Sequence, residues 1–259
     1  MATRLCNMAV GSTVKIKVDG TLKDFIIVHQ GNPDSTIYDS SCDGTWVLLK
    51  DVLIENMPFS ASNSNSYKDS DIHPYLNSDF YGAIDSDIRA AIKQVKIPCQ
   101  NGTGAGGSLA TGPNGLSTKV FLLSGYEVGW TTSDNGYFPK DGVRLAYFGN
   151  SSSGNSKRVA YNGSSAATWW LRSPFINTRD YVWHVSADGS NVYNSSVNPY
   201  GVRPAFILLS TLVVSDDGTV FGNHAPEVTS DAGASGAELG EKNAPFTVGY
   251  TVTDGDGDL

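Results

Sequence analysis

The sequence predicts an α+β fold built from short antiparallel strands, two helices and long loops. Residues 14–18 alternate apolar and lysine side chains, which is the period of a half-buried strand. Residues 88–95 repeat apolar side chains at i, i+3, i+4 and i+7, the spacing of an amphipathic helix. Residues 124–170 show neither period and are rich in loop-forming residues.

The N-terminal segment is expected to form a small antiparallel unit. Asp19-Gly20 has the composition of a hairpin turn after the strand at 14–18. Residues 25–28 then form the returning strand, and residues 46–49 form a third short strand.

Two helices are expected next, each with an acidic residue at its start. Asp71 is placed to cap the first, whose core-facing residues are Ile72, Tyr75, Leu76 and Phe80. Asp85 or Ser86 is placed to cap the second, and Pro98 is expected to end it. Its core-facing residues are Ile88, Ala91, Ile92 and Val95.

The glycine-rich segment 101–118 is expected to be a flexible surface loop. A phosphate-binding loop would need Gly-Lys-Ser/Thr at the start of a helix, and this segment has no such triplet. Residues 119–123 follow as a strand. Aromatic residues at irregular spacing are expected to pin the later loops to the core; these are Trp130, Tyr137, Phe138, Tyr147, Phe148 and Tyr161.

The acidic residues concentrate at the C-terminal end. Residues 210–259 hold nine acidic residues and one basic residue, which accounts for the whole net charge of −8. Residues 212–214 and 219–221 are expected to pair as strands, and residues 246–252 alternate again. We therefore divide the chain into a domain over 1–222 and a partial all-β unit over 223–259. The neutral first part has no clustered basic face, which argues against binding to nucleic acid.

The cysteines and the hydropathy pattern exclude further classes. Cys6, Cys42 and Cys99 are too few, and odd in number, for a disulfide framework, although a Cys42–Cys99 bridge stays open. The first residues lack the apolar region of a signal peptide. No stretch approaches the roughly 20 apolar residues of a membrane span. We therefore expect no signal peptide in this chain and no direct membrane insertion.

Three stretches together resemble a known family. They are CDGTWVLLKDVL (42–53) with VKIP (95–98), LSTKVFLLSGYEVGW (116–130), and WWLRSP (169–174) followed by GVRPAF (201–206). Over residues 10–210 they resemble the C-type lectin fold in its formylglycine-generating-enzyme-like branch. Within it, the similarity is to phage and bacterial variable proteins of diversity-generating retroelements. The tail resembles the start of a bacterial immunoglobulin-like repeat.

This resemblance implies a scaffold that presents a binding surface in its last third. Such a protein would be a non-catalytic display protein on a phage tail or a bacterial cell surface. Its partner would be a protein or glycan receptor on a host or neighbouring cell, and it could form oligomers. It would need no cofactor.

Residues 169–206 support this interpretation by themselves. Trp169 and Trp170 form a compact apolar block that is expected to be core. Arg172 and Arg203 are expected to donate to loop carbonyls inside the fold, with ligand contact as the alternative. Between them, residues 175–200 contain four Asn, four Ser and three Tyr, the residue types of antibody binding loops. An ordinary pair of surface loops would have a similar composition.

We expect residues 181–185 to form a strand, followed by a hairpin turn at Asp188-Gly189. Retroelements of the resembled type randomise adenines, and an Asn codon changed in this way cannot encode Lys, Glu, Gln, Met or Trp. The window 175–200 lacks the first four, and Trp183 is the exception, so it must be a fixed position. Trp183, Val185, Gly189 and Val197 are expected to be fixed. The expected variable, ligand-binding positions are Asn177, Arg179, Tyr181, His184, Asn191, Tyr193, Asn194, Ser195, Asn198 and Tyr200.

Catalysis and metal binding find little support in the sequence. The enzymes of the resembled branch need cysteine chemistry in the C-terminal half, and every cysteine here lies at or before position 99. The four histidines show no metal-ligand spacing. Asp254, Asp256 and Asp258 could ligate calcium with an adjoining repeat, or form a solvated turn. A structural tail-fibre or interaction module is the alternative function, and a divergent enzyme of the same fold is the third.

Overall fold

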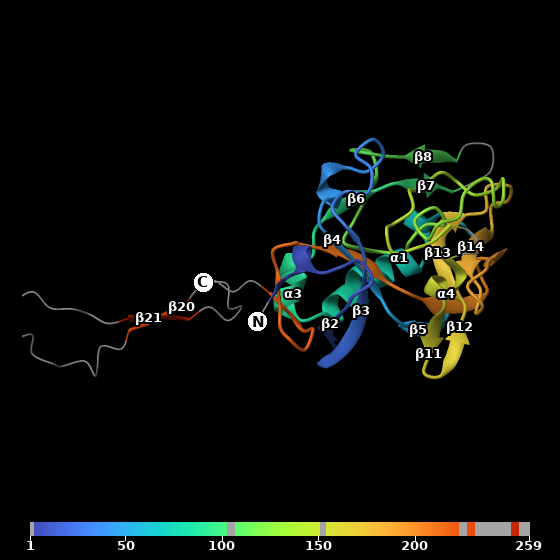
Figure 1. Cartoon of the computed structure of the whole chain (residues 1–259). Coiled ribbons are helices and arrows are strands. Elements are labelled where there is room, and N and C mark those ends of the chain that lie inside the picture. Colours follow the sequence, from blue (N-terminus) through green and yellow to red (C-terminus); the bar gives the residue numbers. More distant parts are fainter. Residues whose placement is uncertain (1–2, 103–106, 151–153, 223–226, 231–249, 254–259) are drawn as a thin grey trace, which may run out of the picture.

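A computed structural model describes residues 3–102, 107–150, 154–222, 227–230 and 250–253. Strands in several small sheets surround a few short helices, so the α+β class is confirmed (Figure 1). Buried residues of both five-stranded sheets belong to one hydrophobic core.

The first sheet joins the two ends of the domain. Its strand order is β10-β17-β4-β3-β2. The strands are β2 (Thr13–Val18), β3 (Thr21–Gln30), β4 (Thr45–Leu49), β10 (Val120–Phe121) and β17 (Ala205–Leu208). The hairpin between β2 and β3 turns at Asp19 and Gly20, both with positive φ as a tight hairpin turn requires. The three strands expected at the N-terminal end are therefore confirmed.

The second sheet carries the segment with the expected binding surface. Its order is β15-β14-β13-β16-β5. The strands are β5 (Ile54–Pro58), β13 (Trp169–Pro174), β14 (Tyr181–Val185), β15 (Asn191–Ser195) and β16 (Pro199–Val202). β14 and β15 form the expected hairpin, with Gly189 at positive φ in the turn. β16 runs parallel to β13, with Trp169 opposite Gly201.

The helical part differs in detail from the sequence expectation. Residues 72–83 are one continuous helical segment: α1 (Ile72–Tyr75), a π-helical turn (Leu76–Phe80) and α2 (Tyr81–Ala83). Its buried side chains include Ile72, Leu76 and Phe80, as expected. Asp71 does not cap this segment, because its carboxylate accepts from the Ala61 N–H instead.

The second helix is shorter than its periodicity suggested. α3 spans Ser86–Ala91, and the Asp85 carboxylate caps it by accepting from the Asp87 N–H. Ile92 is already extended, and Val95 begins β6 (Val95–Ile97). Pro98 therefore does not end the helix. Ile88, Ala91, Ile92 and Val95 are all buried, so the pattern located core residues correctly although it spans two elements.

Smaller ladders complete the body. β1 (Thr3–Arg4), β18 (Val213–Val214) and β19 (Val220–Phe221) form one sheet, which confirms the strand pair expected at 212–221. β6 pairs with β9 (Leu116–Thr118), and β7 (Cys99–Asn101) pairs with β8 (Ser108–Ala110). The glycine-rich segment is thus partly strand rather than all loop, while residues 103–106 lie outside the described residues.

The segment 124–170 is mostly loop, as expected. It holds α4 (Asn155–Arg158) and the hairpin of β11 (Ala160–Asn162) with β12 (Ser165–Ala167). Trp130, Phe138 and Phe148 are buried and pin these loops, whereas Tyr137 and Tyr161 are exposed. No helix among the described residues is long and apolar enough to cross a membrane.

Two short strands are described in the C-terminal part. β20 (Glu227–Ser230) pairs with β21 (Tyr250–Thr253), which lies at the end of the strand expected at 246–252. Asp254, Asp256 and Asp258 lie outside the described residues.

Candidate functional site

The frame of the expected binding segment is fully buried. All six residues of β13 are buried, and Trp169 and Trp170 are the two rings at its start. Their indole N–H groups donate to the Arg158 and Met57 carbonyls, at 3.0 and 2.9 Å. The core role expected of both tryptophans is therefore confirmed.

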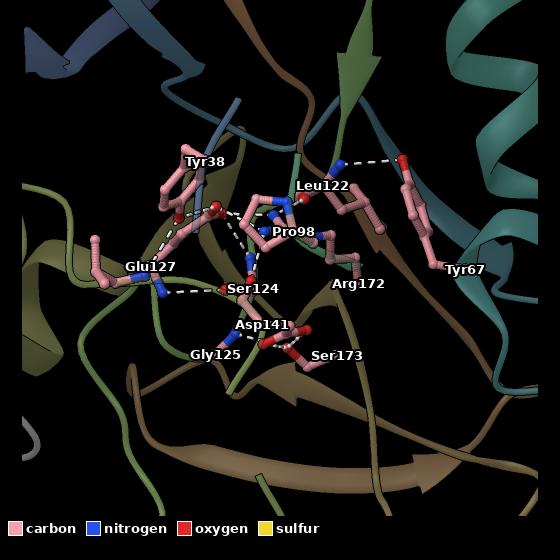
Figure 2. Close-up of polar contacts among 11 residues, drawn as sticks. Tyr38, Tyr67, Pro98, Leu122, Ser124, Gly125, Glu127, Asp141, Arg172 and Ser173 are labelled. Carbon is pink, nitrogen blue, oxygen red and sulfur yellow. Dashed lines mark hydrogen bonds and ion pairs between the residues drawn. The ribbon is translucent and has the colours of Figure 1, made fainter. Parts of the chain in front are cut away.

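Arg172 is the centre of a buried polar network that sequence reasoning located only in part (Figure 2). As expected, its guanidinium donates to loop carbonyls, those of Pro98, Leu122 and Asp141. It also forms a bidentate ion pair with Glu127, with N···O distances of 2.5 and 2.6 Å. Glu127 was not singled out from the sequence, because the pair joins residues that are far apart along the chain.

Each oxygen of the Glu127 carboxylate has a further hydrogen-bond partner besides Arg172. The carboxylate accepts from the Tyr38 hydroxyl at 2.8 Å and from the Ser124 N–H at 2.9 Å. Burial alone would lower the pKa of Arg172, but the Glu127 and Asp141 carboxylates raise it above its ordinary value. The ion pair is therefore fully hydrogen-bonded and shielded from water, which are the conditions under which a buried ion pair is tolerated.

Asp141 and Ser173 extend the network on the other side of Arg172 (Figure 2). The Ser173 hydroxyl donates to the Asp141 carboxylate at 2.8 Å and accepts from the Gly125 N–H, also at 2.8 Å. Burial raises the pKa of Asp141 to about 7. Because both side chains are completely buried, no ligand can reach them, and we assign the network to the scaffold.

Arg203, like Arg172, was expected to donate to loop carbonyls inside the fold, and this is confirmed. Its guanidinium donates to the Leu49 and Lys50 carbonyls, both at 2.8 Å, and lies 4.9 Å from the centre of the Trp169 ring. It is completely buried. Arg172 and Arg203 are thus both framework residues, and neither is available for ligand contact.

The hairpin β14–β15 divides the expected variable positions between two faces. Tyr181 and Trp183 alternate with Val182 and His184, and the register pairs Trp183 with Tyr193. One face therefore carries Tyr181, Asn191, Tyr193 and Ser195 beside Trp183. The other carries His184 and Asn194, with Tyr200 packed across them.

On the Trp183 face, a stack of rings runs from the core to the surface. Trp183 is buried and stacks on Phe138 with ring centres 3.9 Å apart, which confirms it as a packing anchor. Phe175 stacks on Tyr193 at 4.0 Å and contacts Tyr137 at 4.8 Å. Tyr193 and Tyr137 remain 40% and 44% exposed. The stack therefore ends in two solvent-exposed tyrosines on a buried support.

On the other face, the expected exposure of His184 is wrong. Its ring is buried between Trp170 and Tyr200, with ring centres 5.6 and 4.6 Å away. Its Nδ1 atom is buried without a hydrogen-bond partner, and burial lowers its pKa to about 4. Strand alternation could not show this, because the covering Tyr200 comes from β16.

Val197 is a second correction. We expected it to be fixed by packing, but it is 44% exposed in the turn after β15. Val185 and Gly189 are buried, as expected of fixed positions. A Cβ atom at Gly189 would lie 2.1 Å from the Asn155 carbonyl oxygen, and φ is +82°, so only glycine fits this turn.

The loop before β14 holds the most exposed polar candidates. Asn177 and Arg179 are exposed, while Asn198 after β15 is partly buried. The buried amide of Asn65 donates to the Thr178 and Tyr181 carbonyls, at 2.9 and 3.1 Å, and so fixes the loop from beneath. No local pattern in the sequence marks Asn65 for this task.

We name five exposed residues of these segments the Tyr193 patch: Tyr137, Ile176, Asn177, Arg179 and Tyr193. The Ile176 N–H donates to the Tyr137 carbonyl, which ties the two segments together. Ile176 also borders an open pocket of about 470 Å³ whose other lining residues include Leu109, Thr132 and Lys140. Tyr137 was expected only to pin a loop, so its place in this surface was missed.

The described residues contain no cluster of three or more His, Cys, Asp or Glu side chains that could hold a metal ion. Cys42 and Cys99 are buried and free, so the bridge left open above is absent, and burial raises the pKa of both thiols to about 12. A thiol with so high a pKa is a poor nucleophile at neutral pH.

Comparison with known proteins identifies the family of this chain. No curated protein and no solved structure matches the chain. A family model described as "Domain of unknown function (DUF6273)" matches residues 43–210. This span is more than half of the chain. It contains the Tyr193 patch and, apart from Tyr38, the buried Arg172 network. The chain therefore belongs to the DUF6273 family.

Proposed function

We propose that this protein is a non-catalytic, ligand-binding display protein whose contact surface is the Tyr193 patch and the adjoining pocket. The observation that carries the proposal is the pair of exposed tyrosines, Tyr137 and Tyr193, held on the buried Phe175 and Trp183 rings. Tyrosines held rigidly in this way offer a large contact area at low entropic cost.

The ligand of this proposal is a protein or glycan receptor on a cell surface, and the protein acts in attachment on a phage tail or bacterial surface. Exposed polar side chains of the loop before β14 support it: Asn177 and Arg179 can bond hydroxyl, amide or carboxylate groups of such a receptor. The C-type lectin-like scaffold belongs to the same proposal. It is supported by a sheet that joins the domain's two ends and by the long loops beside the second sheet.

Binding of the purified chain to glycan arrays and to cell surfaces tests this function. Tyr193→Ala combined with Arg179→Ala should reduce binding at least about ten-fold, because an aromatic and an arginine are the residue types that dominate interfaces. Tyr161→Ala is the matched control, since Tyr161 is 44% exposed but lies on β11. Equal binding by both variants would remove the Tyr193 patch as the contact surface and favour the structural or interaction module.

We further propose that the solvent-facing positions of 175–200 are hypervariable. His184 is left out because it is buried. The buried frame supports this proposal, since exposed side chains can change at little cost when the core beneath them is unchanged. Sequencing this gene across one population should show substitutions at adenine-derived positions of a nearby template repeat, and none in 1–168. Variation spread evenly along the gene would argue for a static surface.

A further inference from the structure

Strand β15 forms an open edge of the second sheet. Among the residues that the structure describes, its only partner strand is β14, in an unbroken register over all five residues of β15. The Ser186 N–H donates to the Ser190 carbonyl, and the Ser196 N–H donates to the Asp180 carbonyl. In β15, the backbone groups that face β14 therefore belong to the even-numbered residues. By alternation, the backbone N–H and C=O groups of Asn191, Tyr193 and Ser195 point away from the sheet.

The other edges of the two large sheets are protected, each in a different way. β5 contains Glu55 and Pro58, and its register with β16 is interrupted. β2 carries Lys15 and Lys17, and its edge is partly covered because the Lys15 N–H donates to the Gly218 carbonyl.

β10 has only two residues, and the Asn77 side chain bonds both the N–H and the C=O of Val120. Charge, proline, irregular register and cover are the usual devices that prevent a strand edge from pairing with another chain.

Charge, proline and irregular register are absent from β15, and at one end of the strand the Ser195 hydroxyl donates to the Asn63 side chain at 3.2 Å. The sequence of β15, Asn-Val-Tyr-Asn-Ser, contains no charge and no proline, and its register has no bulge. Val192 and Tyr193, on opposite faces of the strand, are both 40% exposed. An uncharged, regular edge with apolar side chains on both faces is a surface that pairs with another strand.

We propose that β15 is a self-association edge, through which two copies of this chain pair antiparallel about a two-fold axis at Tyr193. This goes beyond the proposed ligand binding. In this register Tyr193 faces its own counterpart, and Asn191 faces Ser195 of the second copy. This pairing brings Asn191, Tyr193 and Ser195 of each copy into the ladder and forms about six backbone hydrogen bonds between the copies.

A second copy is favoured as the occupant because the edge is compatible with itself. A two-fold axis places like residues close together, and an uncharged strand meets itself without repulsion. The facing tyrosines gain an aromatic cross-strand contact. Dimer formation exchanges one existing bond, because in the single chain the Ser195 N–H donates to the Asn194 side chain at 2.9 Å. The two sheets become one. The two Tyr193 rings then contact each other, and Tyr137, Ile176, Asn177 and Arg179 are the patch residues left to a ligand.

The test is sedimentation of the full chain over roughly 1–100 µM, a range that covers the affinities expected of weak to moderate dimers. Wild type should associate to a dimer as concentration rises. N191K/S195D should keep the dimer, because each lysine faces an aspartate of the other copy. N191K/S195K should be monomeric, because the same positions then repel. Positions 191 and 195 are too far apart on one strand to pair with each other, so the two variants differ only between copies.

Tyr193→Pro is an independent probe. It removes one outward N–H and leaves the ladder to β14 intact, so dimerisation should weaken at least about ten-fold. Circular dichroism checks that each variant is folded. A wild-type chain that stays monomeric throughout, or a dimer that N191K/S195K leaves unchanged, would overturn the proposal. A monomer that instead captures an extended peptide along β15 would overturn it in favour of a foreign strand.

Discussion

The strand β13 and the loop that follows it at residues 176–180 are neighbours in sequence but differ in burial and in hydrogen bonding. Every residue of β13 is buried, and Arg172 alone bonds three carbonyls and one carboxylate. In the loop, Asn177 and Arg179 are exposed, and the backbone is held from below by Asn65. The contrast teaches that the rigidity of this surface comes from buried polar contacts beneath it, so that the exposed side chains can change without loss of the fold.

The largest effect is expected at the Arg172–Glu127 pair. Arg172→Ala should destabilise the protein by about 3–5 kcal/mol, because it leaves the Glu127 carboxylate buried without its cation. Chemical denaturation measures the loss. The double variant Arg172→Met/Glu127→Gln should recover part of it, since neither charge is then left unpaired. A double variant no more stable than the single one would show that the charge pair is not the source of the loss.

A loss of similar size, but of apolar origin, is expected at Trp169. Trp169→Ala should cost about 3–5 kcal/mol, because the ring is completely buried and supports the Arg203 guanidinium. The same denaturation series reports it. Trp169→Phe retains part of the packing and should lose clearly less. Equal losses in the two variants would argue against a packing role for the ring.

Asn65 supports the loop from beneath, and its removal should affect the loop more than β13. Asn65→Ala should cost about 1–3 kcal/mol, because the Thr178 and Tyr181 carbonyls lose a buried donor. Hydrogen exchange should rise in residues 176–181 more than in β13. Uniform exchange along both segments would contradict the idea that the loop is held from beneath by this one amide.

Acid should weaken the hairpin through His184. Burial places its folded-state pKa at about 4, below the ordinary value of 6.5, so the folded state favours the neutral ring. The stability contributed by this histidine is complete above pH 6.5 and declines as pH falls toward 4. At pH 4.5 the expected loss is about 2–3 kcal/mol. His184→Phe removes this term, so the stability difference between wild type and variant should change with pH over that window. A constant difference would show that His184 is not the titrating group.

The smallest effect is expected on the exposed loop. Asn177→Ala should change stability by less than about 0.5 kcal/mol, because its side chain faces solvent. The midpoint of thermal unfolding is a sufficient measurement. A loss comparable to that of Asn65→Ala would remove the distinction between support and surface.

Sequence patterns predicted the local elements well and the long-range contacts poorly. The hairpins at Asp19-Gly20 and Asp188-Gly189 were found because turn chemistry and alternation are properties of adjacent residues. Val95 was placed on a helix because a short apolar run fits both periods until its partner strand, β9, is known. The ion pair of Arg172 with Glu127 joins two separate segments, and so does the contact in which Tyr200 covers His184. The spacing of residues within one segment cannot predict such contacts.

The sheet of β1, β18 and β19 has a consequence for how such a domain can be used in a larger protein. Thr3 and Arg4 pair directly with Val214 and Val213, so the points where the polypeptide enters and leaves the body are adjacent. β19 lies against α3, at the opposite side of the body in Figure 1 from β13 and β14. A unit with neighbouring entry and exit can be spliced into a surface loop of a host protein, or strung in tandem, without stretching its own backbone. Its tyrosine-bearing end would then project outward in every copy.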